Sequence, residues 1–117
     1  MKILVAIFLI LGCTVLNAQT FESLVVEGNK FYDEGKYEAS AKAFQKALEI
    51  NSENMNLNYN AACSFALSGD TIFSIKYLYE AAKLGWRDVN HLKSDTDLAS
   101  LHQVSKWNTI VSLVEKN

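Results

Sequence analysis

From residue 21 onward, apolar side chains recur every three or four positions, which is the spacing of amphipathic helices. The first run contains Leu24, Gly28 and Phe31 and ends at Gly35. A second run begins at Tyr37 and keeps to one face through Ser40, Ala41, Phe44, Ala47 and Leu48. No stretch alternates apolar and polar residues over the length of a strand. The pattern therefore predicts an all-α fold in which the helices come in pairs.

The pattern repeats after 34 residues. At this offset Phe31 aligns with Phe65, and Gly28 aligns with the equally small Ala62. The other aligned pairs are Gly35 with Gly69, Ser40 with Ser74, Ala41 with Ile75, Phe44 with Leu78 and Ala47 with Ala81. A fixed period of this length is typical of stacked supersecondary units. We expect two helix-turn-helix hairpins, at residues 21–54 and 55–88.

The expected helix ends carry residues that stop or start helices. Glycine takes the left-handed conformation that closes many helices, and it stands at Gly35, Gly69 and Gly85. Asp70 is a good N-cap, because its carboxylate can accept from free amide hydrogens. Between the two units, we expect a stop and a new cap from Asn51, Ser52 and Asn54.

Residues 86–117 do not form a third unit, although they contain regularly spaced apolar positions: Trp86, Val89, Leu92, Leu98, Leu101, Trp107, Ile110, Val111 and Val114. Ser94 with Asp97 predicts a capping box, and Ser105 can cap a last helix. Two units are fewer than the ~3 that a repeat array usually needs. We therefore expect residues 89–117 to form a helical cap over the fourth helix, with the two tryptophans as anchors.

These positions resemble the tetratricopeptide repeat. The first unit matches its pattern at Gly28, Asn29, Phe31, Gly35, Tyr37, Phe44, Ala47 and Leu48, and the second at Ala61, Ala62, Phe65, Gly69, Leu78 and Ala81. The resemblance implies a short α-α superhelix. The segment from Tyr59 to Trp107 is similar to the closing segment of bacterial proteins of this type. The chain departs from the pattern where proline is usual, at Ser52 and Trp86, and where a large apolar residue is common, at Asn58.

The resemblance also implies a function, because the first helix of each pair lines a concave face that holds extended peptides. The positions it implies as exposed are Glu22, Val25, Asn29, Tyr32, Asp33, Asn56, Tyr59, Asn60, Cys63 and Leu67. From these we take as candidate groove residues Val25, Asn29, Tyr32, Asn56, Tyr59, Asn60 and Cys63.

Asn29 and Asn60 match asparagines with which some members hold a peptide's terminal carboxylate. The basic residues of that clamp are absent, so we expect an apolar and polar groove around Tyr32 and Tyr59 that binds a peptide or a protein partner. A merely solvated face is the alternative.

Composition narrows the class of partner further. The chain has 13 acidic and 11 basic residues, a balance that excludes the massed lysine and arginine of a nucleic-acid-binding surface. We expect a monomer or a weak homodimer. A self-associating structural subunit, paired through the open face of its first helix, is the alternative.

The first 18 residues have the pattern of a secretory signal peptide. Lys2 precedes an apolar run at residues 3–12, and Ala18 offers a cleavage site. A bilayer span needs ~20 apolar residues, so we expect no membrane span. Cleavage would leave a single domain, residues 19–117, in a secreted or periplasmic protein. Alternatively, Ile10 to Cys13 resembles a lipobox, and lipidated Cys13 would anchor the protein to a membrane.

The sequence gives little support for a catalytic site or for a cofactor site. Cys63 lies among small helical residues with no histidine nearby in sequence, and a thiol nucleophile needs a nearby base. His91, His102, Asp95 and Asp97 do not have the spacing of three or four converging metal ligands. We therefore expect neither an enzyme nor a cofactor. The alternative is a small hydrolase that depends on the Cys63 thiol or on a metal.

Overall fold

The structure, a computed structural model, describes residues 19–117; the predicted signal peptide and Cys13 lie outside them. The described part is helical throughout and contains no strand. Its elements are α1 (Phe21–Asp33), α2 (Tyr37–Ile50), α3 (Met55–Leu67), α4 (Thr71–Lys83), α5 (Val89–Ser94), the 3-10 helix η1 (Thr96–Leu101) and α6 (Lys106–Lys116). The all-α prediction is confirmed.

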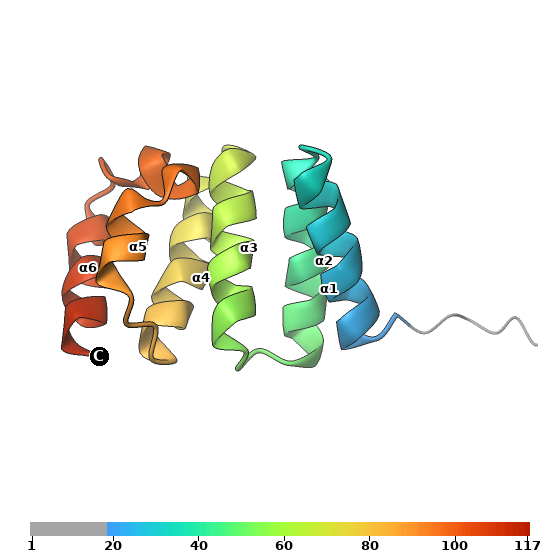
Figure 1. The fold of residues 1–117 in the computed structure, drawn as a ribbon, viewed down its shortest axis with the longest axis horizontal. Coiled ribbons are helices and arrows are strands. Elements are labelled where there is room, and N and C mark those ends of the chain that lie inside the picture. The colour runs from blue at the N-terminus through green and yellow to red at the C-terminus, as the bar shows by residue number, and fades with distance from the viewer. Residues whose placement is uncertain (1–18) are drawn as a thin grey trace, which may run out of the picture.

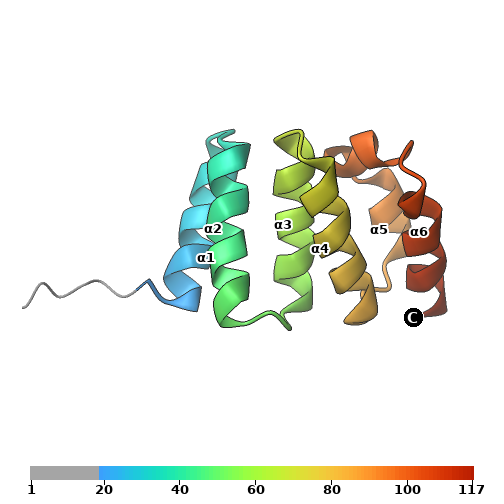
Figure 2. The same ribbon diagram turned by 180° about the vertical axis from the view of Figure 1, so that it is seen from behind.

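The helices stand in two layers (Figures 1 and 2). Figure 1 looks onto α1, α3 and α5, and the reverse view in Figure 2 brings α2, α4 and α6 to the front. Helix α1 packs on α2, α2 packs on α3, and α3 packs on α4. In the tail, η1 packs on α3, and α6 packs on α4. The two predicted hairpins and the helical cap are therefore confirmed, and the cap covers α3 as well as α4.

The two hairpins share one internal hydrogen bond at equivalent positions. Ser40 Oγ donates to the carbonyl of Gly28 at 2.8 Å, and Ser74 Oγ donates to the carbonyl of Ala62 at 2.7 Å. Both serines are fully buried, so each hydroxyl needs a partner. In each hairpin the serine therefore fastens the second helix to the first. Ser40 also lies 2.9 Å from Ser64 Oγ, which links the two hairpins.

Gly28 lets α1 and α2 approach closely. A β-carbon built at this position would lie 2.4 Å from Cε1 of Phe44, whose ring is 1% exposed. At the aligned positions the second hairpin has Ala62 in place of Gly28 and Leu78 in place of Phe44, and both are buried. The smaller residue, glycine, thus accompanies the larger side chain, phenylalanine, and the larger alanine accompanies the smaller leucine.

The predicted helix ends are confirmed in the structure. The φ angles of Gly35, Gly69 and Gly85 are 74°, 86° and 109°, all in the left-handed region. The Asp70 carboxylate accepts from the amide of Phe73 at 3.0 Å, and Asn54 Oδ1 accepts from the amide of Leu57 at 2.9 Å. Local sequence therefore determines where α1, α3 and α4 begin or end.

Asn58 explains how the chain turns between the hairpins without a proline. Its side chain is buried, and Nδ2 donates to the carbonyls of Ser52 at 3.0 Å and Asn54 at 2.9 Å. An amide that satisfies two carbonyls of the connecting loop holds the loop in place. This accounts for a polar residue where the family usually has a large apolar one.

The capping box expected at Ser94 is wrong, and Ser105 stands at the predicted N-cap position without the expected hydrogen bond. Ser94 belongs to α5, and its hydroxyl donates back to the carbonyl of Asn90 at 2.8 Å. The cap of η1 is Asp95, which accepts from the amide of Asp97 at 3.0 Å. Ser105 precedes α6 but makes no capping hydrogen bond, because its own backbone is already helical.

The cap is held by apolar side chains that reach the common core. Leu92, Leu98, Leu101 and Ile110 are fully buried, and Trp107 is 7% exposed. Within residues 19–117, no helix is both long and apolar enough to cross a membrane.

Candidate functional site

A cavity of about 370 Å³ lies between α1, α3 and the cap. Its lining residues come from the two hairpins and from the tail: Asn29, Tyr32, Phe44, Tyr59, Asn60, Cys63, His91, Asp95 and Asp97. Five of the seven candidate groove residues are among them, while Val25 and Asn56 are not. A larger hollow of about 590 Å³, between α2 and α4, contains none of the seven.

Helical periodicity places the lining side chains of α1 and of α3 on the faces that border this cavity. Asn29 and Tyr32 are three residues apart on α1, so they share a face. On α3, Tyr59, Asn60 and Cys63 fall close together along the helix, at most four residues apart. The carboxylates come from the turn where α5 gives way to η1, and this turn lies against α3 because η1 packs there.

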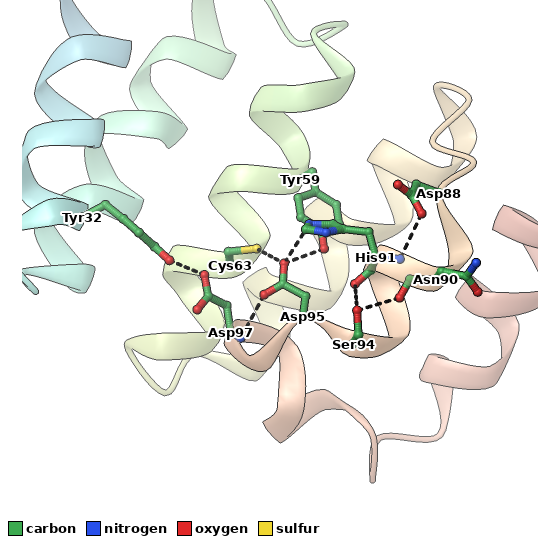
Figure 3. Close-up of polar contacts among 9 residues, drawn as sticks. All are labelled: Tyr32, Tyr59, Cys63, Asp88, Asn90, His91, Ser94, Asp95 and Asp97. Atoms are coloured by element: carbon green, nitrogen blue, oxygen red, sulfur yellow. Dashed lines mark hydrogen bonds and ion pairs between the residues drawn. The ribbon is translucent and has the colours of Figure 1, made fainter.

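Asp95 connects the cap to α3 (Figure 3). Its Oδ2 accepts a hydrogen bond from the Tyr59 hydroxyl at 2.7 Å and a weaker one from Cys63 Sγ at 3.8 Å. His91 Nε2 lies 3.4 Å from the same oxygen. Oδ1 accepts from the amide of Asp97. The chain therefore satisfies both oxygens of Asp95.

Asp97 connects the cap to α1. Its Oδ2 accepts a hydrogen bond from the Tyr32 hydroxyl, across 65 residues of sequence (Figure 3). Within residues 19–117, the hydrogen bonds of the Asp97 side chain involve Oδ2 alone. One oxygen of this half-buried carboxylate is therefore open to another donor.

Comparison with known proteins agrees with this architecture. The family model described as TPR repeat, the tetratricopeptide repeat, matches residues 28–69, from within α1 to just beyond α3. Residues 28–69 of this chain therefore resemble a tetratricopeptide repeat. Repeats of this family indicate a protein-interaction module and are generally not catalytic.

A curated relative extends the match beyond that segment. This relative is a chloroplastic protein from Arabidopsis thaliana, and it is 27% identical over 94 residues. The matched part is 78% of this chain but 28% of the plant protein. The chain thus spans less than a third of that relative. No solved structure matches.

The pKa values of the two tyrosine hydroxyls and of the thiol in the cavity are all raised. Burial, followed by the hydrogen bond to Asp95, raises the pKa of Tyr59. The hydrogen bond to Asp97 is the main cause of the raised pKa of Tyr32. Burial and the two nearby carboxylates raise the pKa of Cys63, so its thiol is a weak nucleophile.

Two candidate groove residues are less exposed than the resemblance to the tetratricopeptide repeat implies. Tyr59 is 3% exposed and Cys63 is 5% exposed, so the expectation of exposure is wrong for both. The reason is the tail, since the Trp86 ring stacks on Tyr59 with centroids 4.0 Å apart. Among the other candidates, Asn29, Asn56 and Asn60 are exposed, and Val25 and Tyr32 are half-buried.

A set of possible metal donors at the cavity differs from the set that the sequence suggested. Sγ of Cys63 and one oxygen each of Asp95 and Asp97 lie within 4.8 Å of one another. Sequence spacing paired the aspartates with histidines instead, and His102 packs on Trp107. Three protein donors are one fewer than a structural zinc site usually has.

Proposed function

We propose that this chain is a non-catalytic interaction module that binds an extended segment of a partner protein in the cavity between α1, α3 and the cap. The observation that carries the proposal is the convergence of five candidate residues from two repeats on one cavity. Its volume of about 370 Å³ falls within the range of ~300–1,000 Å³ typical of ligand pockets.

The lining chemistry suits a peptide backbone. Asn29 on α1 and Asn60 on α3 are exposed at the cavity, and an asparagine amide both donates to and accepts from peptide groups. Tyr32 adds a half-buried ring, which supplies apolar contact area. An extended segment that passes between α1 and α3 would meet both kinds of group.

A hydrolase that uses Cys63 receives less support from the same site. A nucleophilic thiol needs a lowered pKa, and here burial and two carboxylates raise it. His91 Nε2 lies beside the Asp95 carboxylate, which stands between a possible base and the thiol. These observations favour binding over catalysis at the cavity.

Selection from a library of displayed random peptides tests the proposal. We expect the protein to enrich a set of related sequences, and we expect Asn60→Trp to abolish the enrichment because the indole fills the cavity. Asn56→Trp is the matched control, because Asn56 is exposed on the same helix and lies outside the cavity lining. Enrichment that survives Asn60→Trp, or no enrichment at all, would contradict the proposal.

We also propose that the protein is secreted or resides in the cell envelope. The support is the basic start, the short apolar run of residues 3–12 and the small Ala18. The mass of the mature protein, purified from its native cells, should correspond to a chain that begins at Gln19. A mass that corresponds to an acylated Cys13 would instead assign a membrane-anchored lipoprotein, and an intact Met1 would contradict both.

A further inference from the structure

The charges that face the cavity are unbalanced. Asp95 and Asp97 contribute carboxylates, and no lysine or arginine of residues 19–117 lines the cavity. The remaining lining groups from α1, α2 and α3 are neutral: two amides, two phenols, a thiol and the Phe44 ring. From α5, His91 is exposed and lies beside Asp95. The site therefore attracts positive charge and repels a carboxylate.

The two carboxylates are not equally available to a ligand. Both oxygens of Asp95 accept from the chain itself, through Tyr59, Cys63 and the backbone. Asp97 uses Oδ2 for Tyr32 and keeps Oδ1 open. Asp97 is also half-buried, so its carboxylate is partly removed from water. A hydrogen bond from a charged donor to this carboxylate would therefore be stronger than in water.

From this asymmetry, and resting on the proposed function, we infer that the bound segment presents a lysine or arginine side chain to the Asp97 carboxylate. The cationic group would lie beside the Tyr32 ring, whose face attracts cations. Asn29 and Asn60 would meet the neighbouring backbone. Asp95 would add charge without giving up its own hydrogen bonds.

The raised pKa values of Tyr59 and Cys63 agree with this picture. The charges of Asp95 and Asp97 contribute to both shifts, because a negative field disfavours a second anion. The same field favours a cation. It also disfavours the terminal carboxylate that related repeats hold, in keeping with the absence of basic residues from the lining.

A pair of small probes tests the inference without knowledge of the partner. N-acetyl-lysine methylamide carries the ammonium, and its Nε-acetylated form has the same backbone without the charge. We expect the charged probe to give saturable NMR shifts at Tyr32 and Asp97, with an affinity at least about tenfold above that of the acetylated probe. Added salt should reduce this preference.

Two variants complete the test. Asp97→Asn should abolish the preference for the charged probe, and its melting temperature reports whether the cap has stayed in place. Glu53→Gln removes the same charge from an exposed loop outside the cavity, and it should preserve the preference.

Three results would overturn the inference: no saturable shift with the charged probe, equal affinity for both probes, or a preference that survives Asp97→Asn. The peptide selection separates this failure from failure of the proposed function. Enriched peptides that lack a basic residue, and that Asn60→Trp still abolishes, would leave the interaction module standing and remove the cationic contact.

Discussion

Leu98→Ala is expected to lower the free energy of unfolding by about 2–5 kcal/mol, the usual cost of emptying a buried leucine site. Leu98 is 0% exposed to solvent, and η1, which carries it, packs on α3. Equilibrium denaturation in urea measures the change. Leu98 lies next to Asp97, so the variant should also alter the NMR signals of Tyr32 and Tyr59, whose hydroxyls bond the cap.

Leu84→Ala is the matched control for this experiment. Leu84 follows α4 and is 37% exposed, so the same truncation removes much less buried surface. We expect a change within about 1 kcal/mol. If the two variants have equal stability, the cap does not contribute to the common core in the way described.

Gly28→Ala is expected to destabilise the first hairpin by about 2 kcal/mol, since an added methyl overpacks the contact with Phe44. The methyl would lie 2.4 Å from a ring that is 1% exposed and therefore has little room to move. In an exposed helix the same change would stabilise by roughly 1 kcal/mol, because alanine has the higher helix propensity. The sign of the measured change thus reports the packing.

The second hairpin supplies the compensating substitution. Phe44→Leu together with Gly28→Ala recreates the combination of Ala62 with Leu78 at the aligned positions. We expect Gly28→Ala to cost clearly less in the Phe44→Leu background than in the wild type, which gives a favourable coupling energy in a double-mutant cycle. Additive effects would mean that the glycine and the ring do not restrict each other.

Features set by neighbours in sequence could be predicted. The 34-residue period identified both hairpins, and the glycines and Asp70 marked helix ends, because helix capping depends on residues within one turn. Five candidate groove residues share the cavity because α1 and α3 are the first helices of stacked hairpins, and the equivalent positions Asn29 and Cys63 both face it.

Features set by the tail could not be predicted. Nothing in the repeat pattern shows that Trp86 covers Tyr59, or that Asp97 reaches Tyr32 across 65 positions. These contacts depend on how η1 lies against α3, and the tail has no second copy in the chain with which to compare it. The lack of a second copy of the tail also explains why the sequence indicated Ser94, and not Asp95, as the cap of η1.

The bond between Tyr32 and Asp97 joins the opening helix to the closing segment over a single intervening hairpin helix, α3. Neighbouring helices pack ~8–10 Å apart, so one more inserted unit would carry the tyrosine beyond the reach of the carboxylate. The contact therefore depends on the number of units: a further unit inserted between α1 and the tail would remove the link between Tyr32 and Asp97 across the cavity.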